Sequence, residues 1–154
     1  LWRSIIEFVD EDPNQEDCYY LGTMIKYLED DVWMVVDGQQ RLTTLSLLFM
    51  TVRDALDTAA ANGVVGEIDF QNETYDMEGI GRAIAKVTVG FPNAPKLTPK
   101  EASLANFRAF MGYLHPLGNR PAFQTKRRHK YRVVQAYDMF VNKIQERFGE
   151  LSKF

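Results

Sequence analysis

Cysteine, histidine and long apolar runs are all scarce in this sequence. The single cysteine, Cys18, excludes a disulfide within the chain and any zinc site built on two or more cysteines. The longest strongly apolar stretch, 45–50, is interrupted by Ser46 and is far shorter than the roughly 18 residues of a membrane span. No secretory signal pattern opens the chain, so we expect a cytoplasmic domain without a membrane partner. Because the first residue is not Met, we also expect this domain to be part of a longer protein.

Charge is nearly balanced overall but unevenly distributed along the chain. The 18 basic and 21 acidic residues leave a formal net charge of −3 at pH 7, which argues against a general nucleic-acid coat. Residues 1–70 contain 14 acidic and 4 basic residues, whereas residues 71–154 contain 7 and 14. This asymmetry predicts two functional faces, or two parts that attract each other, or simply solvated faces of opposite sign.

The beginning of the chain predicts a helix followed by a β-hairpin. Apolar spacing indicates a helix over 1–10. Two-residue alternation indicates strands over 18–28 and 32–36, and the polar turn 29–31 between them predicts antiparallel pairing.

A long amphipathic helix is expected next, over 39–60, with Gly63 as the left-handed residue after its cap. Its core stripe should consist of apolar residues at helical spacing, namely Leu42, Leu45, Leu48, Phe49, Val52 and Leu56. The following segment, 64–89, has polar and glycine interruptions and predicts a loop with short strand or helix pieces.

The rest of the chain predicts a helical part. Two prolines and a glycine make 90–95 a linker. The run Thr98-Pro99-Lys100-Glu101 has the pattern of a capping box, so a helix should begin there, and a last helix is expected over 125–148. The fold class is therefore α+β, with a small α+β part over 1–90 and a helical lobe over 97–154.

The sharpest local feature is a strand, an Asp-Gly turn and a helix start. Helix N-termini present unpaired backbone N–H groups and about half a positive charge. Gly38 removes the side chain that would block a ligand, and Arg41 adds a guanidinium fork that can grip phosphate. The neutral donors nearby are those of Gln39, Gln40 and Thr43. This is the chemistry of a phosphate cradle, although not the Walker pattern. In the alternative interpretation, Asp37 is a plain N-cap and the glutamines are solvent-facing helix formers.

These residues resemble a known family, the N-terminal domains of GmrSD-type modification-dependent restriction endonucleases. The resemblance is carried by Asp37-Gly38-Gln39-Gln40-Arg41-Leu42-Thr43-Thr44-Leu45, which is similar to the DGQQR motif of that family, and by the preceding Tyr20-Leu21-Gly22-Thr23-Met24. The segments 96–99 and 131–140 resemble the helical lobe of the family with lower specificity. From the first to the last, these segments span residues 20–140, which is most of the chain.

The resemblance implies a ParB/sulfiredoxin-like fold that binds an NTP at the start of the motif helix. The nucleotide-binding residues would be Gly38, Gln39, Gln40, Arg41 and Thr43. Family members are linked to NTP hydrolysis that accompanies restriction of modified DNA, and their nuclease centre lies in a separate His-Asn-His-type domain or subunit. The chain has no counterpart of the family's opening strand, of the type Gln-Arg-x-Tyr-x-Trp, which contributes to the nucleotide site. We expect the chain to begin at the helix that follows this strand.

A basic cluster lies at the start of the last expected helix. It consists of Lys126, Arg127, Arg128, Lys130 and Arg132, with Tyr131 among them. Contact with the DNA backbone is one interpretation, since basic clusters with an interleaved aromatic suit nucleic acid. Docking against the acidic N-terminal half and exposure to solvent are the alternatives. The helix dipole disfavours cations at an N-terminus, which indicates that the charges have a partner.

Two functions follow from these observations. The first is an NTP-binding and NTP-hydrolysing domain of a phage-defence restriction system, with Mg²⁺ as cofactor. The catalytic residues of this NTPase would be Asp37 and Arg41. Arg41 would stabilise the transferring phosphoryl group, and Asp37, which is also the expected metal ligand, would orient a Mg²⁺-bound water. The second is a non-catalytic DNA-recognition or subunit-docking module of such a system. A structural fragment without a ligand is a third interpretation.

Overall fold

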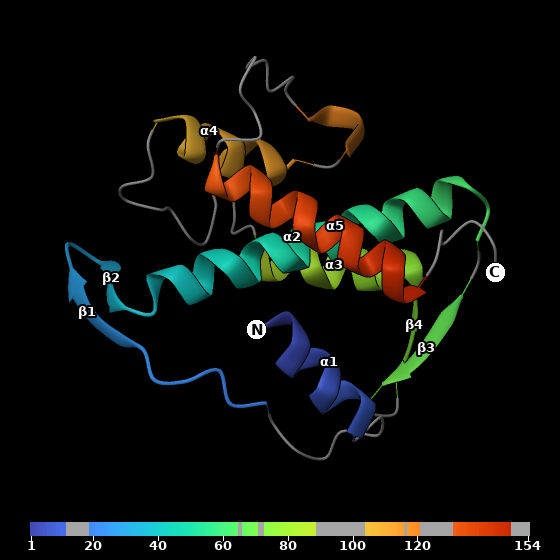
Figure 1. Ribbon diagram of the computed structural model, residues 1–154, viewed down its shortest axis with the longest axis horizontal. Coiled ribbons are helices and arrows are strands. Elements are labelled where there is room, and N and C mark those ends of the chain that lie inside the picture. The colour runs from blue at the N-terminus through green and yellow to red at the C-terminus, as the bar shows by residue number, and fades with distance from the viewer. Residues whose placement is uncertain are drawn as a thin grey trace. The chain divides into compact units, whose positions relative to one another are not determined.

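The computed structural model describes residues 1–11, 19–64, 66–70, 73–88, 104–115, 117–120 and 131–148 (Figure 1). The chain forms two compact units, Leu1–Arg41 and Leu42–Phe154, and the boundary between them falls inside a helix. The expected division into 1–90 and 97–154 stays a prediction, because the intervening residues 89–103 lie outside the described part of the chain.

The first unit contains helix α1 (Trp2–Glu11) and an antiparallel hairpin of β1 (Ile25–Glu29) and β2 (Val32–Asp37). Asp30 and Asp31 form its turn with φ of 48° and 60°, the left-handed conformations that two-residue hairpin turns need. The expected helix and hairpin are thus confirmed.

The first strand begins later than the alternation predicted. Its expected range started at Cys18, which lies outside the described residues, yet β1 starts only at Ile25. Gly22 has a φ of +89°, a conformation that cannot continue a strand. Residues 19–24 therefore form a loop that leads into the hairpin.

Helix α2 (Gln39–Ala61) agrees with the predicted helix to within one residue. It ends as predicted at Gly63, whose φ is +77°. The Gly63 N–H donates to the Ala60 carbonyl at 3.0 Å, and the Val64 N–H donates to the Ala59 carbonyl at 3.0 Å. This pair of hydrogen bonds is a Schellman motif, which satisfies carbonyls that the end of the helix leaves open.

The segment after α2 contains a second hairpin and a helix. Strands β3 (Glu67–Phe70) and β4 (Glu73–Asp76) pair antiparallel, and α3 (Met77–Thr88) follows directly. The two strands match the short pieces expected in this segment. Helix α3, with 12 residues, is longer than the short helical piece that was expected. Two glycines, Gly79 and Gly81, lower the helix propensity and concealed this helix in the sequence pattern.

Three further elements complete the second unit: α4 (Leu104–Tyr113), the 3₁₀ turn η1 (Leu117–Asn119) and α5 (Arg132–Phe148). Both predicted helices of this part are confirmed where the structure describes them. Tyr131 precedes α5 and is not helical, so α5 begins later than the predicted residue 125. The linker 90–95 and the capping box 98–101 lie outside the described residues.

The core of the second unit corrects the predicted stripe of α2. Phe49, assigned to that stripe, is 37% exposed, whereas Leu47 is 2% exposed. The buried apolar side chains come from three helices and are Leu47, Leu48, Met50, Ala59, Ala109, Phe110, Tyr113, Val133, Val134, Tyr137, Phe140 and Ile144. The stripe was misplaced because α2 also buries polar residues, Thr51, Arg53 and Asp54, which a hydrophobic pattern assigns to the solvent face.

The described residues thus form an α+β fold in which helices predominate, as the sequence predicts. None of the described helices is long and apolar enough to cross a membrane.

Candidate functional site

The Asp-Gly turn of the predicted cradle joins the end of β2 to the start of α2 (Figure 1). Gly38 is buried and has a φ of +93°, and its N–H donates to Asp37 Oδ1 at 2.8 Å. A Cβ added at residue 38 would lie 2.8 Å from Met24 Cγ. Glycine is therefore required here both by the backbone conformation and by the lack of space. The Asp37 carboxylate thus accepts the N–H of the turn residue Gly38. Asp37 lies one position before the N-cap of α2, whereas the alternative interpretation made it the N-cap itself.

Arg41 joins the first turn of α2 to the loop that precedes β1. Its Nη1 donates to the Leu21 carbonyl at 2.9 Å, and its Nη2 donates to the Thr23 carbonyl at 2.5 Å. Nη2 also lies 3.4 Å from Asp37 Oδ2. The arginine of the motif thus holds a loop about 20 residues earlier in the chain, a role that its spacing alone could not indicate.

Gly22 makes this arrangement sterically possible. A Cβ at residue 22 would lie only 2.1 Å from Arg41 Nη1, and the φ of +89° also favours glycine. The two segments that carry the family resemblance, 20–24 and 37–45, are therefore linked by a direct contact between Arg41 and the backbone around Gly22.

The other predicted nucleotide-binding residues lie on the same helix start. Gln39 and Gln40 are exposed, and Gln39 Nε2 donates to the Val35 carbonyl. Thr43 is half-buried one turn further along. Asp37, the predicted metal residue, has a side chain that is 63% exposed. Among the residues that the structure describes, no group of three or more His, Cys, Asp or Glu side chains could hold a metal ion.

The predicted DNA-binding cluster is described only at its end. Lys126, Arg127, Arg128 and Lys130 lie outside the described residues. Arg132 is the exposed first residue of α5. Its contact with DNA stays a prediction.

The structure contains a buried ionic cluster that the sequence pattern did not reveal. It consists of Arg53 and Asp54 on α2, Arg120 after η1 and Tyr137 on α5. Asp54, which is 4% exposed, accepts from Arg53 Nη2 at 2.8 Å through Oδ1, and from Arg120 Nη2 and the Tyr137 hydroxyl, both at 2.5 Å, through Oδ2. One carboxylate therefore holds two guanidinium groups and a phenol, as buried charges require.

Arg53 also closes the end of α4. Its guanidinium donates to the carbonyls of Tyr113, Leu114 and His115 at 2.8, 2.8 and 3.0 Å. Tyr113 is the last residue of α4, and its carbonyl has no partner within the helix and carries partial negative charge, while Leu114 and His115 follow the helix directly. The buried guanidinium therefore supplies both hydrogen bonds and a compensating positive charge. The only sign of this cluster in the sequence was an adjacent Arg-Asp pair within the expected amphipathic helix.

Tyr137 links α5 to α2 within the same cluster. Its ring stacks on that of Tyr113, with centroids 3.9 Å apart and planes inclined by 7°. Burial, followed by the hydrogen bond to Asp54, raises the pKa of Tyr137 from 10.0 to about 12. These contacts make the ionic cluster a structural element of the second unit.

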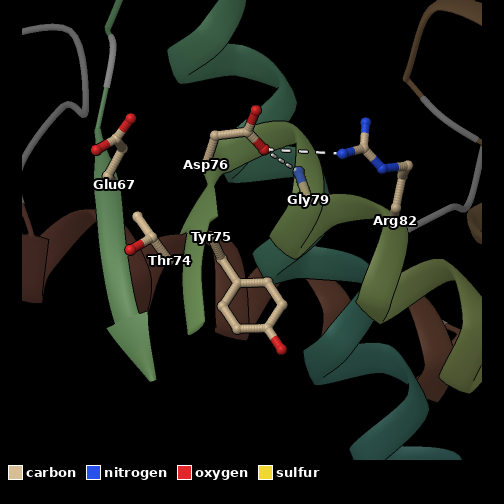
Figure 2. A pocket seen from close by; sticks show the side chains of 6 residues that line it. All are labelled: Glu67, Thr74, Tyr75, Asp76, Gly79 and Arg82. Carbon is tan, nitrogen blue, oxygen red and sulfur yellow. Dashed lines mark hydrogen bonds and ion pairs between the residues drawn. The ribbon is translucent and has the colours of Figure 1, made fainter. Parts of the chain in front are cut away.

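An open polar pocket lies where the second hairpin meets α3, and its lining residues are Glu67, Thr74, Tyr75, Asp76, Gly79 and Arg82 (Figure 2). Asp76 Oδ1 accepts the Gly79 N–H at 2.5 Å and lies 3.9 Å from Arg82 Nη2. Asp76 is thus the N-cap of α3, which explains its hydrogen bond with the Gly79 N–H.

The sequence model of the family described as "GmrSD restriction endonuclease, N-terminal domain" matches residues 1–153. The chain belongs to this family. No curated protein and no solved structure was found to match it. Membership in the GmrSD N-terminal domain family makes the chain a component of a restriction system.

Proposed function

We propose that this GmrSD N-terminal domain binds an NTP whose phosphates lie at the start of α2, and that it hydrolyses this NTP during restriction of modified DNA. The observation that carries the proposal is the buried Gly38 at a φ of +93°, placed directly before a 23-residue helix. Family membership supports the restriction context.

The first turn of α2 offers suitable chemistry for phosphate. Its backbone N–H groups and the positive end of the helix dipole attract anions. The proposed nucleotide-binding residues are Gly38, Gln39, Gln40, Arg41 and Thr43. A guanidinium has five N–H donors. Arg41 can therefore hold the Leu21 and Thr23 carbonyls and also present an N–H group and its charge to a phosphate.

Asp37 suits Mg²⁺ as a single protein ligand. Mg²⁺ in nucleotide sites is commonly held by one or two carboxylates together with phosphate oxygens and waters, and the Asp37 carboxylate is exposed beside the proposed phosphate position. The ion would neutralise phosphate charge. Asp37 would orient a water, and Arg41 would stabilise charge that develops on the transferring phosphoryl group.

The proposed partners are DNA and a nuclease domain or subunit of the His-Asn-His type. The basic residues from Lys126 to Arg132 would contact the DNA backbone, since clustered Lys and Arg side chains neutralise phosphates. Such contacts would position the DNA and would not read its modification.

Calorimetric titration of the protein with each of the four NTPs and Mg²⁺ tests this function. We expect at least one NTP to bind, Gly38→Val to abolish binding, and Arg41→Ala to weaken it. Arg3→Ala is the matched control, because Arg3 is an exposed arginine on α1 that pairs with Glu7 at 2.8 Å. Melting curves of all variants separate loss of binding from loss of folding.

The outcomes distinguish the two functions derived from the sequence. Binding followed by phosphate release identifies an NTPase domain, whereas binding without release identifies a non-catalytic module. If no NTP binds the wild-type protein, or if a folded Gly38→Val variant binds as tightly as wild type, the phosphate site is wrong.

A further inference from the structure

The loop 20–24, here called the Tyr20 loop, is held against the start of α2. Arg41 donates to the carbonyls of Leu21 and Thr23, on either side of Gly22. Just before the loop, the Tyr19 ring lies 5.3 Å from the Phe8 ring of α1. The loop is thus restrained at its beginning by a ring contact and in its middle by two hydrogen bonds.

A second contact joins the end of this loop to the Asp-Gly turn. The Met24 side chain lies so close to Gly38 that a Cβ there would be 2.8 Å from Met24 Cγ. Gly38 is the residue that we place nearest to the phosphates. The Tyr20 loop therefore borders the proposed phosphate site.

The Tyr20 side chain is 76% exposed. Its hydroxyl shares a hydrogen bond of 2.9 Å with Thr23 Oγ1, within the same loop. This bond restrains the ring while leaving it exposed. A restrained, exposed aromatic ring beside a ligand site can stack on a planar ligand with a small loss of entropy.

We propose that the Tyr20 loop is the second wall of the nucleotide site and that the Tyr20 ring stacks on the nucleobase. The inference rests on the proposed function, because it takes the phosphates to lie at the start of α2. Every base has a π face, so stacking on tyrosine recognises a base without selecting one of the four. Tyr20 therefore distinguishes a nucleotide from an inorganic phosphate chain.

Gly22 and Arg41 affect base binding indirectly, because they fix the position of the loop that carries Tyr20. A side chain at residue 22 would collide with Arg41 Nη1, so Gly22→Ala must break the contact that fixes the loop. In this respect Arg41 is a positioning residue for Tyr20, in addition to its proposed role toward phosphate.

The test compares two ligands, an NTP and inorganic tripolyphosphate, each with Mg²⁺. We expect Tyr20→Leu to weaken NTP binding about tenfold and to leave tripolyphosphate binding unchanged. Tyr20→Phe keeps the ring and should bind nearly as well as wild type. Tyr27→Leu is the matched control, since Tyr27 is also an exposed tyrosine, on β1, and should affect neither ligand. Gly22→Ala, verified as folded by its melting curve, should lower the preference for NTP over tripolyphosphate as Tyr20→Leu does.

The outcomes separate this inference from the function on which it rests. If Tyr20→Leu changes neither affinity, or weakens both ligands equally, the stacking role is wrong although the phosphate site stands. If the wild-type protein binds neither ligand, the proposed function is overturned and this inference with it.

Discussion

Replacement of Tyr137 by Phe tests the buried ionic cluster through its pH dependence. The Tyr137 hydroxyl donates to Asp54 Oδ2 at 2.5 Å, and hydrogen bonds to charged groups contribute roughly 1.5–3 kcal/mol. The pKa of Tyr137 is raised from 10.0 to about 12 in the folded protein. This difference makes the folded protein more stable at neutral pH than at strongly alkaline pH by roughly 2–3 kcal/mol. Because the folded pKa lies above the unfolded one, this stability is complete below pH 10 and is lost as the pH rises toward 12.

Urea unfolding of wild type and Tyr137→Phe between pH 8 and about pH 12 measures the effect. At pH 8 the variant should be less stable than wild type by roughly 2–3 kcal/mol, and the two curves should converge toward pH 12. Lysines titrate in the same range, so only the difference between the proteins is interpreted. Tyr27→Phe, at an exposed tyrosine, should follow wild type throughout. A constant difference between wild type and Tyr137→Phe over the whole range would refute the reasoning.

Two further predictions concern the corrected core and the basic cluster. Leu47→Ala should lower the free energy of unfolding by roughly 2–5 kcal/mol, and Phe49→Ala by clearly less, because only Leu47 is fully buried. If urea unfolding shows that Phe49→Ala lowers the free energy of unfolding as much as Leu47→Ala or more, the stripe predicted from the sequence is right and this correction is wrong. Replacing Arg127, Arg128 and Lys130 together by Ala should weaken binding of modified and unmodified DNA equally, and should make the salt dependence of log affinity shallower by up to about 0.9 per lost contact. A lower melting temperature with unchanged DNA affinity would favour docking against the acidic half instead.

Features encoded by neighbouring residues were predictable from the sequence. The hairpin turn at Asp30-Asp31 and the end of α2 at Gly63 follow from local backbone preferences, and both are confirmed. The start of α2 directly after Gly38 also agrees with the motif, because turn and helix signals coincide there.

Features that depend on distant residues were not predictable. Arg41 meets Leu21 and Thr23 across 20 and 18 residues, and Asp54 meets Tyr137 across 83. Hydrophobic periodicity contains no information about such polar pairs, so the buried face of α2 was misplaced. The phosphate site at the start of α2 therefore stays a prediction from the sequence, and the sequence could not show that Arg41 holds the Tyr20 loop.

The central claim is that nucleotide phosphates bind at the first turn of α2. The most direct measurement is a backbone amide NMR titration of the ¹⁵N-labelled protein with an NTP and Mg²⁺. Binding should produce its largest shifts at the amides of Gln39 and Gln40, because these N–H groups would donate to the phosphates, and at Gly38, whose N–H donates to the Asp37 carboxylate beside the proposed site. Unchanged amides at these three residues under saturating NTP, or largest shifts confined to α5, would contradict the claim.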